Sequence, residues 1–66
     1  DDRKRAALLS ERAQLMERAF AAGEGALPET LRALSAAQDA AAAAKRQEAA
    51  VGLARAKVLQ ALGVTP

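Results

Sequence analysis

The feature that most limits the fold is a single break in an otherwise helix-forming chain. Gly23, Gly25 and Pro28 fall within six positions, and the stretches on both sides are rich in residues that favour helix. Gly23 suits the left-handed position after a helix end, and Gly25 gives the turn further freedom. Pro28 suits the first turn of a new helix, where its missing N–H costs nothing. The break therefore predicts two helices joined by a short turn.

The predicted elements are, in chain order, a helix over residues 3–22, a tip over residues 23–27, a long helix over residues 28–62 and a tail over residues 63–66, together one unit spanning residues 1–66. A tip this short makes neighbouring helices antiparallel. The expected fold is an all-α, antiparallel two-helix coiled-coil hairpin. Because the helices would measure roughly 30 Å and 50 Å, about 15 residues of the long helix are expected to lack a partner in this chain.

Two heptad series mark the expected contact face of the first helix. They are Leu8, Leu15 and Ala22, and Leu9, Met16 and Gly23, with Ala19 and Phe20 on the same side. In an antiparallel hairpin, residues equidistant from the turn face each other. The contacts expected near the tip are Leu8, Leu15, Phe20, Leu31 and Leu34.

The long helix changes character along its length. Between Ser35 and Ala50 it has no apolar side chain larger than alanine, which favours close approach of another helix as well as high helix propensity. Large apolar residues return beyond the reach of the first helix, at Val51, Leu53, Val58, Leu59 and Leu62. We expect these residues to need a segment of a parent chain or of another copy. The isolated chain is therefore expected to self-associate or to stay partly folded.

The composition argues against chemistry on this chain. It has no Cys, His, Tyr or Trp, its acids are scattered, and no nucleophile stands beside a base, so we expect no catalytic residue, no metal site, no cofactor and no enzyme. The net charge is only +2, and the basic run at residues 3–5 directly follows Asp1 and Asp2. With Phe20 as the sole aromatic residue, the chain is not expected to bind nucleic acid.

No apolar run approaches the roughly 20 residues of a membrane span, and we expect no signal peptide within these residues. The sequence opens on Asp1 rather than Met, from which we expect a piece of a longer protein. Membrane contact is therefore expected only through other regions of a parent protein.

From Glu17 to Gly63 the sequence resembles the second periplasmic helical hairpin of TolC-like outer membrane efflux proteins. That family's pattern is an aromatic residue, two further residues, a glycine, a short polar tip, an acid at the start of a long helix, and an "ALG" ending about forty residues after the glycine. The matching residues here are Phe20, Gly23, Glu29-Thr30-Leu31 and Ala61-Leu62-Gly63, without a gap. The match covers roughly three quarters of the chain, and residues 1–16 fit the preceding helix.

The resemblance implies a fragment of a periplasmic α-barrel in a trimeric channel of the Gram-negative outer membrane. The hairpin would form the duct wall of a tripartite efflux pump, and its tip would dock a periplasmic membrane-fusion adaptor protein. The implied adaptor-binding residues are Gly23, Glu24, Gly25, Ala26 and Leu27, and the implied channel-entrance residues are Phe20, Glu29 and Arg32. The unpaired part of the long helix would then pack on other helices of the barrel.

Two positions depart from the family pattern. Gly25 stands where well-known members carry an arginine, and Arg32 stands where they carry a second acid; both take part there in closing the entrance. Glu29 keeps the first acid, and Arg32, three residues later on the same helix face, could pair with it.

Two alternatives stay open. One is the coiled-coil hairpin of the periplasmic adaptor itself, which is also alanine-rich and antiparallel but usually carries an Arg-Leu-Ser-like tip motif that is absent here. The other is a generic coiled-coil interaction module.

Overall fold

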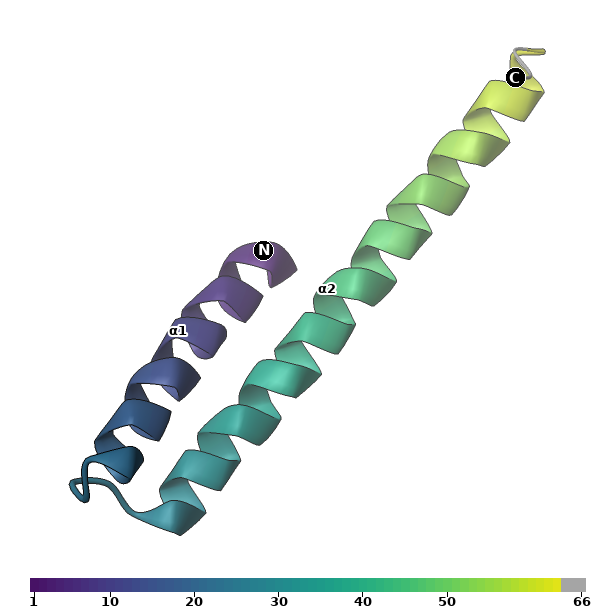
Figure 1. The fold of residues 1–66 in the computed structure, drawn as a ribbon. Coiled ribbons are helices and arrows are strands. Elements are labelled where there is room, and N and C mark those ends of the chain that lie inside the picture. Colours follow the sequence, from purple (N-terminus) through teal and green to yellow (C-terminus); the bar gives the residue numbers. More distant parts are fainter. Residues whose placement is uncertain (64–66) are drawn as a thin grey trace.

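The computed structural model describes residues 1–63 as two helices paired into an extended hairpin (Figure 1). α1 spans Asp2–Ala21 and α2 spans Leu27–Ala61, so both helices begin and end one residue earlier than expected. No strand occurs within these residues, and the molecule measures 60 × 18 × 14 Å. The predicted all-α hairpin is confirmed. Gly63, the first residue of the expected tail, has a φ of 75° just after the end of α2, and the rest of that tail, residues 64–66, lies outside the described residues.

The start of α1 is capped by a side chain. The Asp1 carboxylate accepts hydrogen bonds from the backbone N–H groups of Arg3, at 2.8 Å, and Lys4, at 3.1 Å. These groups have no partner inside the helix, and an acid is also favoured by the helix dipole. Asp1 thus does more than offset the basic run that follows it.

The end of α1 is a Schellman motif built on Gly23. The N–H of Gly23 donates to the Phe20 carbonyl at 3.0 Å, and the N–H of Glu24 donates to the Ala19 carbonyl at 2.8 Å. This pattern needs a left-handed residue, and Gly23 supplies it with a φ of 79°. The glycine ends α1 as the sequence predicted.

α2 starts without a side-chain cap at Ala26, and Pro28 occupies its first turn. Thr30 stabilises this turn from within. Its hydroxyl donates to the Ala26 carbonyl at 2.9 Å, and its side chain faces α1 with only 4% of the residue exposed. Because the hydroxyl is satisfied locally, this polar residue can be buried at the base of the hairpin.

The interface between the helices consists mainly of small residues. Ala13 on α1 is 2% exposed and Ala40 on α2 is 7% exposed, and they are the buried apolar residues of the described chain. The half-buried positions that flank them are Asp2, Ala6, Leu9, Met16 and Ala19 on α1, and Ala33, Leu34, Ala37, Ala43 and Ala44 on α2. Methyl groups let two helix backbones lie close together, as the alanine-rich sequence of α2 suggested.

Only one of the two heptad series on α1 faces α2. Leu9 and Met16 lie toward α2, while Leu8 and Leu15 are 65% and 62% exposed. The expected contacts of Leu8, Leu15, Phe20 and Leu31 are therefore wrong, and only Leu34 among the expected set is half-buried. Once Ala13 and Ala40 set the line of contact, the Leu8 series points away from it, about a third of a helix turn from its neighbour.

α2 continues well past the start of α1 (Figure 1). The two helices are joined at that level by an ion pair between Arg3 Nε and Glu48 Oε1, 3.2 Å apart. Every described residue from Lys45 onward is exposed. We call residues 49–62 the overhang, and it lacks a partner in the described chain as the sequence predicted.

Candidate interaction surface

The tip is an exposed turn held from below by backbone hydrogen bonds. Gly23, Glu24, Gly25, Ala26 and Leu27 are all exposed, so the structure presents the predicted docking residues together at one end of the hairpin. The Schellman bonds of Gly23 and Glu24 hold this turn against the last turn of α1. A partner would therefore meet a turn of defined shape.

The two tip glycines serve different purposes. A β-carbon on Gly23 would meet nothing within 4 Å, so its requirement is the positive φ alone. A β-carbon on Gly25 would lie 3.1 Å from the Phe20 backbone nitrogen and 3.4 Å from the Phe20 Cα. Gly25 is thus the point of close approach, where the chain returns past the end of α1. A larger side chain at position 25 would have to push this turn outward.

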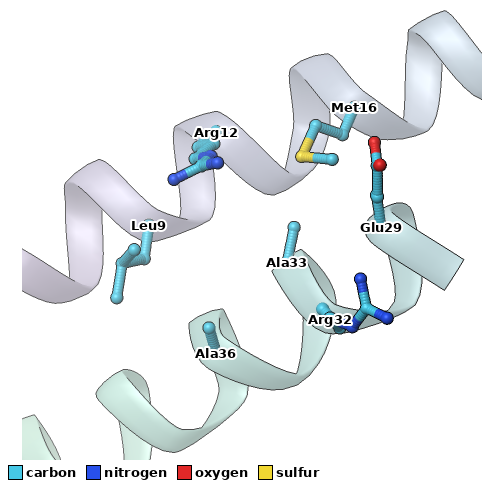
Figure 2. Close-up of a pocket in the computed structure, with 7 residues that line it drawn as sticks. All are labelled: Leu9, Arg12, Met16, Glu29, Arg32, Ala33 and Ala36. Carbon is cyan, nitrogen blue, oxygen red and sulfur yellow. The ribbon is translucent and has the colours of Figure 1, made fainter. Parts of the chain in front are cut away.

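A surface groove of about 290 Å³ runs between the helices beside the tip (Figure 2). Its lining residues are Leu9, Arg12 and Met16 from α1 and Glu29, Arg32, Ala33 and Ala36 from α2. Figure 2 shows Glu29 extending from α2 toward α1 beside Met16. The groove therefore has an apolar floor and carries both signs of charge.

The predicted entrance residues divide between two places. Glu29 and Arg32 line this groove together, whereas Phe20 is exposed at the end of α1 and takes no part in it. The expected pairing of Glu29 with Arg32 is not formed: within residues 1–63 no salt bridge joins them. An exposed pair gains little free energy, and Glu29 instead extends across the groove.

Arg12 was not among the predicted site residues, although it lines the groove with Glu29 and Arg32. Its sequence signal was available. Leu9, Arg12 and Met16 are spaced i, i+3 and i+7, so an arginine lies within the apolar face of the first helix. Arg12 lies beside the interface between the helices only because the series with Leu9 and Met16 faces α2.

The second exposed surface is the overhang. Val51, Ala54, Arg55, Val58 and Leu59 gather there around a shallow, fully apolar hollow. Leu62 extends this surface and, at 70%, is the most exposed large apolar residue of residues 1–63. Arg55 and Lys57 are the charged side chains of this part of the sequence, which holds no acid from Ala49 to its end. The overhang is an apolar helix face, and the aliphatic part of the Arg55 side chain lies along it.

These surfaces suit contact with other helices. Across the described residues, no group of acidic side chains is placed to hold a metal ion. No helix there is both long enough and apolar enough to span a bilayer. The exposed surfaces of the described hairpin are the tip at residues 23–27, the charged groove beside it, and the overhang of α2.

Comparison of the chain with known protein families, with curated proteins and with solved structures found no match in any of the three.

Proposed function

We propose that this hairpin is a periplasmic hairpin of a TolC-like outer membrane efflux channel, where it forms duct wall and docks an adaptor protein through its tip. The observation that carries the proposal is the unequal length of the two helices. α2 keeps an exposed apolar face for more than three turns beyond α1. In a duct built of several hairpins, each such overhang has neighbouring helices to pack against.

The tip supports the same proposal. The glycine of the family pattern, Gly23, adopts the positive φ that a tight helix end requires, three residues after Phe20. The turn that follows is exposed from Gly23 to Leu27, which leaves its backbone accessible to a partner. The hairpin acts in this proposal as a structural and docking element, with no catalytic residue, cofactor or metal.

The experiment is site-specific photocrosslinking in cells that express the full protein to which this hairpin belongs. A photoreactive residue at Glu24 should crosslink to a periplasmic adaptor identified by mass spectrometry, whereas the same residue at Glu11, far from the tip on α1, should not. Outer-membrane fractionation in the same cells tests the location. Two results would contradict the proposal: crosslinks from Glu24 to a cytosolic protein, and absence of the full protein from the outer-membrane fraction. Either result would favour a generic coiled-coil interaction module.

Efflux itself gives the second measurement. Gly23→Val should abolish efflux-dependent resistance while the trimer stays assembled in the outer membrane, because a non-glycine residue in the left-handed conformation costs about 1 kcal/mol or more and the β-carbon would intrude on a close partner. Glu24→Gln should have a much smaller effect, since an exposed charge pair contributes under about 1 kcal/mol. Normal resistance in the Gly23→Val strain would show that the tip is only a turn.

A further inference from the structure

The overhang continues the same helix face that α2 uses to contact α1. Positions seven residues apart on this face are Thr30, Ala37, Ala44, Val51 and Val58. The first three are buried or half-buried against α1, whereas Val51 and Val58 are 46% and 58% exposed. The change occurs where α1 begins, beside the Arg3–Glu48 ion pair. The overhang therefore presents a helix-binding face in unbroken register.

Small residues give way to larger ones along that face. Opposite α1 the heptad positions are threonine and alanine, and on the overhang they are valine, with Leu59 and Leu62 beside them. An unpartnered heptad face of this kind is what a coiled-coil partner packs against. A helix lying in line with α1 would cover it in the same antiparallel sense.

Charge limits which helix can lie there. Arg55 lies between Val51 and Val58 on the overhang and lines the same apolar hollow as both. A second copy of the overhang would bring its own Arg55 and Lys57 against the first pair, with no acid on either overhang to compensate. Like charges across a helix interface are destabilising, and residues that flank the seam select the partner by charge.

We propose that the overhang binds an amphipathic helix of another segment that carries an apolar heptad face with Asp or Glu beside it, one acid lying opposite Arg55. The occupant is a helix because the exposed stripe keeps the period and register of the α1 contact. A basic helix that lies on a membrane carries its cations on the polar face, whereas Arg55 is set within the apolar stripe. This inference adds the chemistry of the partner to the overhang contact of the proposed function, and the peptide test below does not depend on efflux.

The test uses the whole chain and two synthetic helical peptides of about three heptads. Both peptides have Leu and Ala at the contact positions and carry a fluorescence quencher. One has Glu at the flanking positions, and the other has Lys there. Because the chain has no cysteine, a single Gly52→Cys change provides a labelling site, and a side chain at Gly52 meets nothing within 4 Å. A control label at Ser35→Cys lies on α2 away from the overhang.

The Glu peptide should quench the label at position 52 with one peptide per chain and should leave the label at position 35 nearly unaffected. The Lys peptide should bind about tenfold more weakly or not at all. Arg55→Glu should weaken binding of the Glu peptide about fivefold or more and strengthen binding of the Lys peptide. Arg46→Glu makes the same change of charge on α2, two residues after Ala44 and off the contact face, and should alter neither affinity by more than about twofold.

A second variant, Val58→Asp, covers the case in which Arg55→Glu disturbs the helix. It should abolish binding of the Glu peptide, and circular dichroism should show the same helix content as the unchanged chain. Several results would overturn the proposal. They are equal binding of the two peptides, equal effects of the Arg55 and Arg46 reversals, and failure of the Glu peptide to bind. Quenching of the label at position 35 as strongly as that at position 52 would also overturn it, as would binding to phosphatidylglycerol vesicles in place of the peptide.

Discussion

At the scale of single residues, the tip shows how two neighbouring glycines can be required for different physical reasons. Gly23 needs a backbone conformation that side chains disfavour, but it has open space around it. A β-carbon on Gly25 would crowd the backbone of Phe20, so this position needs the absence of a β-carbon. The two positions should therefore respond differently to the same substitution.

Gly23→Ala should lower the free energy of unfolding of the hairpin by about 1 kcal/mol, because alanine in the left-handed region is strained. Gly23→Asn should cost less, since asparagine tolerates that conformation. Urea unfolding followed by circular dichroism measures both. Equal stability of the alanine variant and the wild type would mean that Gly23 is not held at positive φ.

Gly52→Ala should stabilise the hairpin, in contrast to Gly23→Ala. This glycine lies inside α2 with nothing within 4 Å of its would-be β-carbon, so alanine adds helix propensity without a clash. The gain should be up to about 1 kcal/mol of helix stability, visible as higher helix content at a given temperature. A loss of helix content would show that another group approaches the glycine.

At the scale of the elements, the hairpin is held by a thin line of small side chains. Ala13 and Ala40 are the buried apolar residues among residues 1–63, and the ion pair between the helices joins side chains that are 77% and 58% exposed. An exposed pair contributes little, so packing around the alanines must set the separation of the helices. Leucines, which the sequence made conspicuous, lie mostly outside this line.

Ala13→Leu should therefore destabilise the hairpin by about 1–3 kcal/mol, because a larger side chain at a closed position forces the helices apart. Leu8→Ser is the matched control on the same helix, where the wild-type side chain is 65% exposed. It should change the free energy of unfolding by no more than about 0.5 kcal/mol. The opposite order of the two effects in urea unfolding would restore Leu8 as an intrachain contact.

At the scale of the whole molecule, most of the large apolar side chains are exposed. Among residues 1–63 ten of them are exposed, on both helices and at the tip. They fall into separate groups, with Leu8 and Leu15 on the outer side of α1 and the others near the tip or on the overhang. A hairpin with so little buried core leaves most of its large apolar side chains exposed.

The isolated chain should accordingly self-associate or remain only partly folded at micromolar concentration, because exposed apolar faces of this extent seek partners. Sedimentation at micromolar concentration measures the association, and circular dichroism on the same samples measures the helix content. A fully helical, cooperatively melting monomer of the unchanged chain would contradict the prediction.

The sequence predicted the turn between the helices better than it predicted their interface. Gly23, Gly25 and Pro28 act through local backbone geometry, so they predict the break and the hairpin wherever the rest of the chain packs. The length of α2 and its lack of a partner follow from the positions of those same residues. The groove depended instead on which heptad series faced inward, and so Arg12 was not foreseen.

Local sequence therefore determined the two helices, their turn and their unequal lengths, because helix propensity and turn chemistry act within a few residues. The tertiary structure alone decided that Leu9 and Met16, rather than Leu8 and Leu15, face α2. Two neighbouring heptad series are almost equally apolar on paper, and only the close fit of Ala13 and Ala40 between the backbones separates them. Thr30 is also buried on the α2 face that contacts α1, and the heptad positions of that face continue to Val51 and Val58.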